Sequence, residues 1–252
     1  MMFFMKKFYK LLICLTLLTA GLLPPAVAAV ADDYFTAIKN DNDGELVTIL
    51  FRGFDANTLD SEGRHGLHIA LMEGSLKVAK TLLDLSGTKV DTRSKNDETP
   101  LMMAALKGHT AVAKRLIARG ADVYKTGWTP LHYAATGGHV EMIKLLLENH
   151  AYIDTESPNK TTPLMMAAQY GTAQAVKLLI DEGADITLKN DVGMTALDFS
   201  RLGESRASFD VLTAALKEAS KPAPVAQQPA PAAVPVAPAV PAGNQPFKTR
   251  SD

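Results

Sequence analysis

The sequence predicts an all-α protein, a solenoid of stacked helix-turn-helix units with short hairpin-like turns between them. One observation is a period, because a leucine recurs after 34, 30, 33 and 33 residues, at Leu67, Leu101, Leu131, Leu164 and Leu197. Another is the surrounding pattern. Thr-Pro precedes three of these leucines, and a glycine closes each segment, at Gly74, Gly108, Gly138, Gly171 and Gly203. A period of this length indicates a repeat architecture, in which each unit buries its apolar face on its neighbours.

The first helix of a unit has a defined start. Thr99, Thr129 and Thr162 suit the N-cap, where a hydroxyl accepts a hydrogen bond from an otherwise unpaired first-turn amide. The proline that follows supplies a preset φ and lacks a donor that the first turn does not need. Paired alanines such as Ala104-Ala105 keep this helix thin, so we expect neighbouring units to approach closely.

The second helix of a unit carries Leu, Ile and Val that fill the space between layers. Gly120 and Gly183 follow it, where a helix ends in the left-handed region that glycine adopts without a Cβ penalty. His150 occupies the equivalent place, and we expect it to have a positive φ at a small cost. Helices of about ten residues are marginal alone in water, so their stability must come from stacking.

These motifs resemble the ankyrin repeat, whose pattern runs G-x-T-P-L-H-x-A-A-x-x-G-H and then V-x-x-L-L-x-x-G-A-D. Residues 129–132 read Thr-Pro-Leu-His, and residues 183–185 read Gly-Ala-Asp. The resemblance implies a stack whose contacts join only adjacent repeats. It covers residues 32–220 and implies six units including the caps, at 32–59, 60–92, 93–122, 123–154, 155–187 and 188–220.

Some positions depart from the family pattern. The stretch from Gly120 to Thr129 is three residues shorter than the family spacing, so we expect a truncated finger-like turn before Trp128. The first and last units match more weakly, as capping repeats do. In the last unit, Asp198 and Ser200 replace residues that would otherwise pack against a further repeat.

Residues 1–31 predict a secretory signal peptide. Three lysines precede an apolar run from 11 to 23, and small residues follow, with cleavage expected near Ala28 or Ala31. A membrane anchor is the alternative, but such a run spans only about 20 Å, less than the ~30 Å hydrocarbon core. Cleavage removes Cys14, the only cysteine. An exported protein without disulfides fits a bacterial periplasm, so we expect a periplasmic or secreted protein with no membrane span after cleavage.

Residues 221–252 predict a Pro/Ala-rich disordered tail. This segment contains eight prolines, a density that supports neither a helix nor a central strand. Its PxxP patterns are weak indications of a ligand in a segment built of proline and alanine, so we favour a passive spacer over a docking motif.

Charge and motifs argue against several function classes. Between residues 32 and 220, 20 basic residues stand against 26 acidic ones, unlike the concentrated basic face that binds nucleic acid or anionic lipid. His65 and His68 lie near Asp60 and Glu62, but no second ligand pair with metal spacing accompanies them, so we favour a structural role. The sequence contains no G-x-S-x-G, H-E-x-x-H or glycine-rich phosphate motif. We expect no catalytic residue, cofactor or metal, and no nucleic-acid partner.

The resemblance also implies a binding groove lined by the turn tips and the exposed side of the first helices. The tip residues are Arg64, Glu98, Trp128, Thr161 and Met194. The variable residues of the first helices are Met72, Glu73, Leu106, Lys107, Thr136, Gln169 and Tyr170. Trp128 is the only tryptophan, and interface hot spots are enriched in tryptophan, so we favour a partner contact for it. The alternative is that Trp128 shields the shortened turn by lying on Tyr133 or a neighbouring helix.

These observations predict a non-enzymatic protein-protein interaction module, an adaptor or scaffold exported to the periplasm as a monomer. Its protein partner would bind the concave surface. Two alternatives remain open. One is an envelope spacer that uses the Pro-rich tail, and the other is an inhibitor or protective partner of an exported enzyme.

Overall fold

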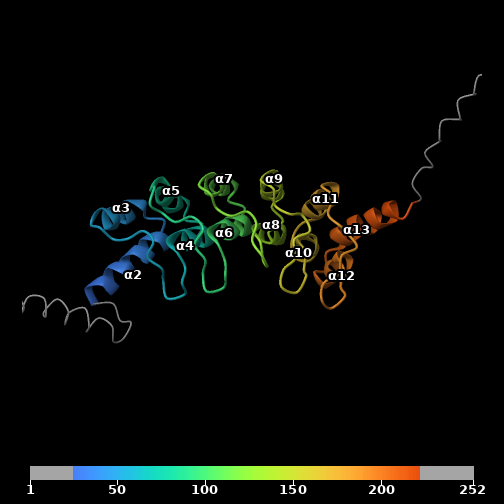
Figure 1. Cartoon of the computed structure of the whole chain (residues 1–252), viewed down its shortest axis with the longest axis horizontal. Helices are drawn as coiled ribbons and strands as arrows, with labels where there is room; N and C mark the ends of the chain where they lie inside the picture. The colour runs from blue at the N-terminus through green and yellow to red at the C-terminus, as the bar shows by residue number, and fades with distance from the viewer. Residues whose placement is uncertain (1–24, 222–252) are drawn as a thin grey trace, which may run out of the picture. The chain divides into compact units, whose positions relative to one another are not determined.

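A computed structural model describes residues 25–221 of the chain (Figure 1). The predicted signal peptide up to residue 24 and the predicted tail from residue 222 lie outside the described residues. The described part forms twelve α-helices and no β-strand, apart from one isolated bridge between Leu59 and His65. The all-α prediction is therefore confirmed for this part of the chain.

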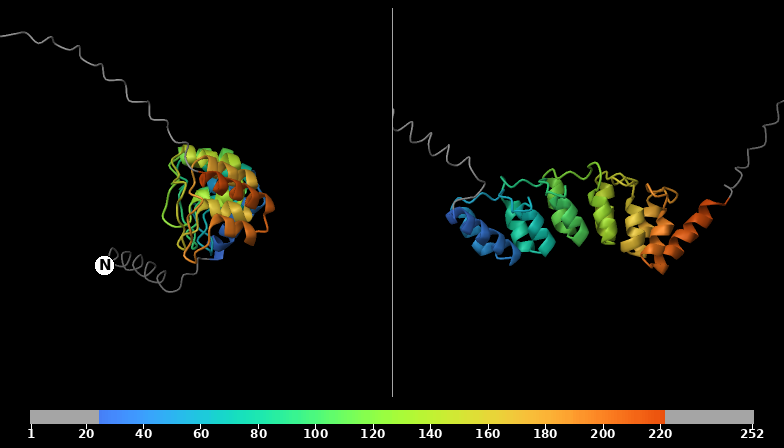
Figure 2. Two further views of the ribbon diagram at one scale, coloured as in Figure 1. Left: turned by 90° about the vertical axis from the view of Figure 1, so that its right-hand side faces the viewer. Right: turned by 90° about the horizontal axis from the view of Figure 1, so that it is seen from below.

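Each unit contributes an inner and an outer helix. The inner helices are α2 (Pro25–Lys39), α4 (Gly66–Glu73), α6 (Pro100–Lys107), α8 (Pro130–Thr136), α10 (Pro163–Tyr170) and α12 (Ala196–Leu202). The outer helices are α3 (Asp43–Phe51), α5 (Leu76–Asp84), α7 (Thr110–Ala118), α9 (Val140–Glu148), α11 (Ala173–Asp181) and α13 (Arg206–Ala219). In Figure 1, α5, α7, α9 and α11 form one row above α4, α6, α8 and α10, and Figure 2 shows the helices following one another along the long axis.

The helices pack only on near neighbours. Inner helix α6 contacts α4 and α8, and outer helix α9 contacts α7 and α11. Every extensive helix-to-helix contact in the described part of the chain lies within one unit or between adjacent units. The predicted solenoid is confirmed, and its core is a continuous row of buried side chains between the two rows of helices.

The predicted caps begin two of the inner helices. The hydroxyl of Thr99 accepts a hydrogen bond from the Met102 amide at 3.3 Å, and that of Thr162 accepts one from the Met165 amide at 3.4 Å. Thr129 differs, because its Oγ1 lies 3.0 Å from Nδ1 of His132. Proline is the first residue of α6, α8 and α10, as the sequence predicts.

The ends of the outer helices also follow the prediction. Gly120 and Gly183 have φ of 87° and 96°, and His150 takes the same left-handed conformation with φ of 66°. An L side chain at this place is strained, which explains why glycine is the family's residue here. His150 carries that small cost in the fourth unit.

The inner helices approach each other as closely as the paired alanines predict. Ala104, Ala134 and Ala167 are fully buried between neighbouring units. At the end of α12 the approach is closer still, since a Cβ placed on Gly203 would lie 2.0 Å from the Gln169 carbonyl oxygen. Gly203 has φ of −81°, which any residue adopts, so close backbone approach and not conformation requires the glycine.

The C-terminal cap departs from the expectation at one residue. Ser200 is buried, because the long helix α13 packs on both α12 and α11, and its hydroxyl donates to the Leu197 carbonyl at 2.7 Å. The idea that Ser200 marks a surface left open by a missing repeat is therefore wrong. Asp198 instead caps α12, accepting hydrogen bonds from the Thr195 amide at 3.0 Å and hydroxyl at 2.8 Å.

The first packed helix begins earlier than the predicted domain start at residue 32. Helix α2 starts at Pro25, so both candidate cleavage positions, Ala28 and Ala31, lie within it. Ala31 is buried against the core, as is Tyr34 one turn later. Among the described helices, none combines the length and the apolar character that crossing a membrane requires.

Candidate functional site

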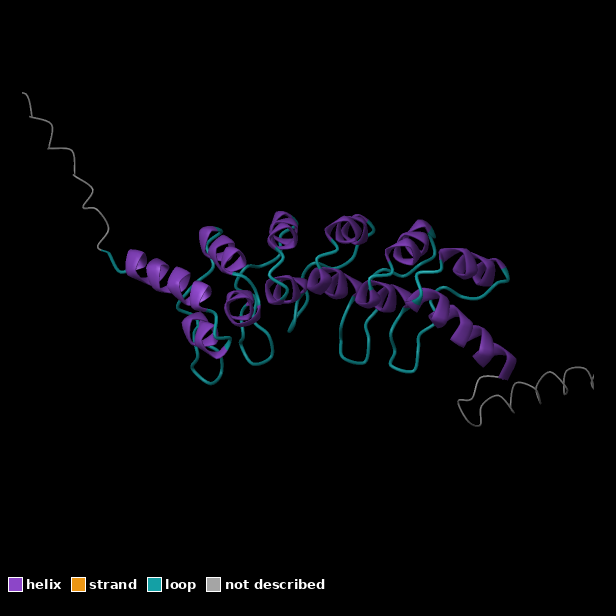
Figure 3. Ribbon diagram, turned by 180° about the vertical axis from the view of Figure 1, so that it is seen from behind, coloured by secondary structure: helices purple, strands orange, loops and turns teal. Residues whose placement is uncertain are grey.

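Five loops, which we call fingers, join each outer helix to the next inner helix. They comprise residues 52–65, 85–99, 119–129, 149–162 and 182–195. The third finger, residues 119–129, is three residues shorter than the fourth, residues 149–162. This confirms the truncation predicted before Trp128. Figure 3 shows the short loop in the middle of the row of fingers. The fingers and the inner helices together form the predicted binding face.

Two equivalent histidines fasten fingers to inner helices. Nε2 of His68 lies 2.7 Å from the Glu98 carbonyl oxygen, and Nε2 of His132 lies 2.8 Å from that of Thr161. Nδ1 of His68 accepts a hydrogen bond from the His65 backbone amide at 3.3 Å, and Nδ1 of His132 accepts one from the Thr129 amide at 3.2 Å. Nε2 therefore carries the hydrogen, and it donates a hydrogen bond to the backbone carbonyl of the finger that follows.

Burial keeps these rings neutral. It lowers the pKa of His132 to about 4 and lowers the pKa of His68 as well. Nδ1 of His65 accepts the Leu67 amide at 3.1 Å, so His65 and His68 use their nitrogens within the fold. Among the described residues, no three His, Cys, Asp or Glu side chains gather in a way that could hold a metal ion.

Four predicted binding residues line one pocket of about 330 Å³ on this face, which we call the groove pocket. They are Arg64, Met72, Glu73 and Glu98. The pocket opens between the first and second fingers, and its wall is completed by residues of α4 and by Met103 of α6. The structure thus brings together side chains that are more than 30 residues apart in sequence.

The other predicted residues are more scattered. Lys107 and Tyr170 are exposed at the ends of α6 and α10, Tyr170 to 60%. Half-buried positions are held by Leu106, Thr136, Gln169 and Met194. Thr161 is only 2% exposed, so its assignment as a binding side chain is wrong. Its amide bonds the Ser157 hydroxyl and its carbonyl bonds His132, and both bonds draw it into the stack.

Trp128 takes the position that the alternative interpretation describes. Its ring meets the His132 ring of α8 edge-on, with centroids 5.1 Å apart, and it packs against the core. Trp128 also lines a depression of about 450 Å³ together with Glu156 and Pro158. Trp128 is therefore mainly part of the fold and only partly available to a partner.

Sequence reasoning missed the side chain that fills the shortened finger. Lys125 is buried, and its Nζ contacts the Asp97 carboxylate and, at 3.1 Å, the Asp97 carbonyl of the preceding finger. The hydrogen bond from Lys125, together with the Arg93 guanidinium, holds the pKa of Asp97 below its usual value. The sequence pattern carries no signal for this contact, because Lys125 lies in a finger whose length departs from the repeat.

Sequence reasoning also missed an aromatic pair. Tyr124 and Tyr152 are 53% and 60% exposed and line a pocket of about 490 Å³ with Asp154, Glu156 and Asp185. The repeat pattern could have revealed Tyr152, because it follows Ala151 at the position where the family pattern has aspartate. Exposed tyrosines beside a binding face are typical of interface anchors.

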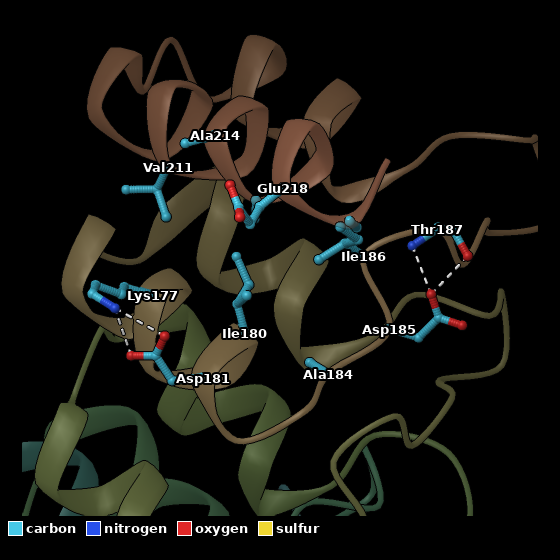
Figure 4. A pocket seen from close by; sticks show the side chains of 12 residues that line it. Lys177, Ile180, Asp181, Ala184, Asp185, Ile186, Thr187, Val211, Ala214 and Glu218 are labelled. Atoms are coloured by element: carbon cyan, nitrogen blue, oxygen red, sulfur yellow. Dashed lines mark hydrogen bonds and ion pairs between the residues drawn. The ribbon is translucent and has the colours of Figure 1, made fainter. Parts of the chain in front are cut away.

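An apolar groove of about 860 Å³ lies at the C-terminal end of the stack. Figure 4 shows Ile180 and Ile186 below the helix that carries Val211 and Glu218, with Lys177 and Asp181 paired with each other. Lys177 Nζ lies 2.8 and 2.7 Å from the two carboxylate oxygens of Asp181. This groove lies between outer helix α11, the start of the fifth finger at residues 184–187, and the capping helix α13.

The fold defines a helical repeat protein in which fingers join the outer helices to the inner helices. The family model described as ankyrin repeats (3 copies) matches residues 35–126, 67–157, 123–190 and 151–204. The chain belongs to the ankyrin repeat family.

Similar curated proteins share segments of the repeat array. The probable E3 ubiquitin-protein ligase XBOS31 of Oryza sativa subsp. japonica is 42% identical over 85 residues, 32% of this chain and 19% of that protein. The 26S proteasome non-ATPase regulatory subunit 10 of Dictyostelium discoideum is 40% identical over 79 residues, 30% of this chain and 34% of that protein. The chain thus spans about a fifth of the first relative and about a third of the second.

Two solved structures share the fold over most of the described residues. The human ASB11 ankyrin repeat domain matches with a TM-score of 0.55 and 24% identity, covering 72% of this chain and 96% of that one. The second structure is of the Bd0816 predatory endopeptidase from Bdellovibrio bacteriovorus in complex with immunity protein Bd3460. One of its chains matches with a TM-score of 0.62 and 26% identity, covering 72% of this chain and 97% of that one. Ankyrin repeats in general mediate binding between proteins.

Proposed function

We propose that this chain is an exported ankyrin repeat protein that binds a protein partner in the bacterial periplasm through the face formed by its fingers and inner helices. The match to a chain of the endopeptidase complex carries the proposal, because it extends over nearly all of that chain. The exposed ends of the inner helices support it, since Lys107 and Tyr170 project where the fold needs no apolar contact.

The partner that this match favours is an exported peptidase, with this chain as its protective inhibitor. The solved complex pairs a peptidase with an immunity protein, and a chain in it has the same helical stack. A rigid concave face suits this role, because a preorganised surface that covers an active site loses little conformational entropy on binding. Inhibition then needs no reactive group in the ankyrin chain.

Export is tested by the N-terminus of the protein recovered from the periplasm. The apolar run from 11 to 23 and the small residues after it favour cleavage there. Of the two candidate positions, cleavage after Ala28 keeps the buried Ala31 and most of α2, so we expect the mature chain to begin at Ala29. Mass spectrometry of the N-terminal peptide reads the site. Recovery of the uncleaved chain in the cytoplasm contradicts export.

Partner capture tests the binding face. The mature chain, purified and used as bait in a periplasmic extract, is expected to recover a peptidase and to reduce its hydrolysis of peptide bonds. The double variant Lys107→Glu, Tyr170→Ala is expected to recover at least tenfold less, because losing a hot-spot aromatic costs about 2 kcal/mol or more.

The control is an even more exposed aromatic on an outer helix. Phe51 lies on outer helix α3 and is 92% exposed, so Phe51→Ala removes a large apolar side chain without touching the binding face. Equal loss with both variants contradicts the assigned face. Normal recovery by the double variant, combined with loss when residues 222–252 are deleted, favours the envelope spacer instead.

A further inference from the structure

The groove pocket has a chemical character that points to the kind of side chain it accepts. This inference rests on the proposed binding face and names the group that enters it. The pocket lies where the first two fingers meet inner helices α4 and α6. Its floor is apolar, since Ile69 and Met103 are buried and Met72 packs against the core. Methionine side chains adapt readily to an inserted chain.

The rim of the pocket carries three carboxylates, those of Glu62, Glu73 and Glu98. Glu98 is fixed in place, because Oε1 accepts a hydrogen bond from the Tyr133 hydroxyl at 3.2 Å and Oε2 one from Ser94 at 3.4 Å. Burial, then the charge of Glu98, raises the pKa of Tyr133, so the phenol stays protonated and remains a donor. A carboxylate that accepts only these two hydrogen bonds has further lone pairs that can accept hydrogen bonds from a ligand.

The two cations of the pocket already have partners within the chain. The Arg64 guanidinium binds Asp60, with Nε and Nη2 2.8 and 2.7 Å from Oδ2. Nζ of Lys95 donates to the Ser61 carbonyl at 2.5 Å. His68 adds no charge, because its Nε2 hydrogen is held by the Glu98 carbonyl and burial lowers its pKa. Because the carbonyl partner of Lys95 is uncharged, Lys95 keeps its positive charge. The three glutamates of the pocket and Asp60 still outnumber the two cations, so the rim has an excess of negative charge.

We propose that the groove pocket receives an arginine side chain of the partner protein. The aliphatic stem lies on Ile69, Met72 and Met103, as long basic side chains commonly lie along apolar surface. The guanidinium binds Glu98 and Glu73 at the rim. Arginine fits better than a smaller cation, because its planar fork donates to carboxylates through several parallel hydrogen bonds.

The test uses the pocket's own methionines as probes. The mature chain, labelled with ¹³C at the methionine methyl groups, is titrated with Nα-acetyl-L-arginine amide and followed by NMR. Saturable shifts are expected at Met72 and Met103, and none at Met142, which is buried in α9. Citrulline amide has nearly the same shape without the charge, and we expect it to bind at least tenfold more weakly.

Two variants locate the charge requirement. Glu73 is exposed on α4, so Glu73→Gln leaves the fold intact, and it is expected to weaken arginine amide binding about threefold to tenfold. Adding Glu98→Gln is expected to remove saturable binding. The matched control is Glu141→Gln with Glu148→Gln on outer helix α9, which is expected to bind as the wild type does.

The outcomes separate this proposal from the proposed function. Equal shifts with citrulline amide, or unchanged binding in the Glu73→Gln, Glu98→Gln variant, overturn the arginine pocket. If partner capture persists in that variant while arginine binding is absent from the wild type, only the pocket assignment fails. Loss of capture in the Lys107→Glu, Tyr170→Ala variant with arginine binding retained supports the binding face and leaves the pocket as its separate subsite.

Discussion

Replacing Leu131 with alanine is expected to lower the free energy of unfolding by about 3 to 5 kcal/mol, the range for a fully buried leucine. Leu131 lies in α8, and its side chain is completely buried between α6 and α10, both of which contact α8. Because units contact only their neighbours, a weak central unit has no distant contacts to sustain it. We expect this variant to uncouple the units on either side of α8.

Urea unfolding followed by two signals measures this effect. Trp128 is the only tryptophan and belongs to the same unit, so its fluorescence reports that unit, while circular dichroism at 222 nm reports all helices. The two transitions are expected to coincide in the wild type and to separate in Leu131→Ala, fluorescence changing at lower urea. The control is Leu202→Ala, because Leu202 lies on inner helix α12 and is 59% exposed. Coincident transitions in both variants contradict the uncoupling.

Most of the fold could be predicted because the repeat places the same local physics at the same position. Thr-Pro begins an inner helix at Pro100 and at Pro163, and Gly120 ends an outer one. Such local rules act within about four residues of sequence, so they can be read without knowing the rest of the molecule. The missing three residues before Trp128 could be counted directly, and the third finger is shortened accordingly.

The binding face could be predicted only in part, because which way a finger residue faces depends on contacts with the next unit. Thr161 and Glu98 hold the same place before a Thr-Pro pair, and the backbone carbonyl of each accepts a hydrogen bond from a histidine ring. Their side chains differ, since Glu98 reaches the groove pocket while Thr161 is enclosed by the stack. Lys125 shows the same limit, because its partner Asp97 is 28 residues away.

The stability of the stack is expected to fall as the pH is lowered from 7.5 to 5. Burial lowers the pKa of His65 and of His132 to about 4, whereas an unfolded histidine has a pKa of about 6.5. Above pH 6.5 both states are neutral at these rings and the histidines add no pH dependence. Between pH 6.5 and 4 these two histidines bind protons in the unfolded chain but stay neutral in the folded chain, so unfolding becomes more favourable. At pH 5 each histidine contributes a loss of about 2 kcal/mol.

The window between pH 7.5 and 5 separates histidines from carboxylates. The pKa values of Asp97 and Asp198 are lowered by hydrogen bonds, to Lys125 in the first case and to Thr195 in the second. A carboxylate of this kind loses its stabilising effect only as the pH falls below about 4, so it contributes little above pH 5. The expected slope in this window is therefore a property of buried imidazoles.

His132→Met isolates one of those imidazoles with a residue that the repeat itself uses. Met102 and Met165 occupy the equivalent position, where their sulfur atoms accept the Thr99 and Thr162 amides at 3.3 and 3.5 Å. At pH 7.5 the variant loses the bond to the Thr161 carbonyl, at a cost of about 1 to 3 kcal/mol. Urea unfolding at pH 5 should then show a smaller difference in the free energy of unfolding between the variant and the wild type. The reason is that the stability of the variant falls by about 2 kcal/mol less than that of the wild type. Met102→Leu changes the same position in another unit without removing an ionisable group, and it should keep the wild-type slope. A wild-type slope in His132→Met would show that the ring is not held neutral by burial, and would remove the basis for treating His132 as the donor that fastens the fourth finger to the stack.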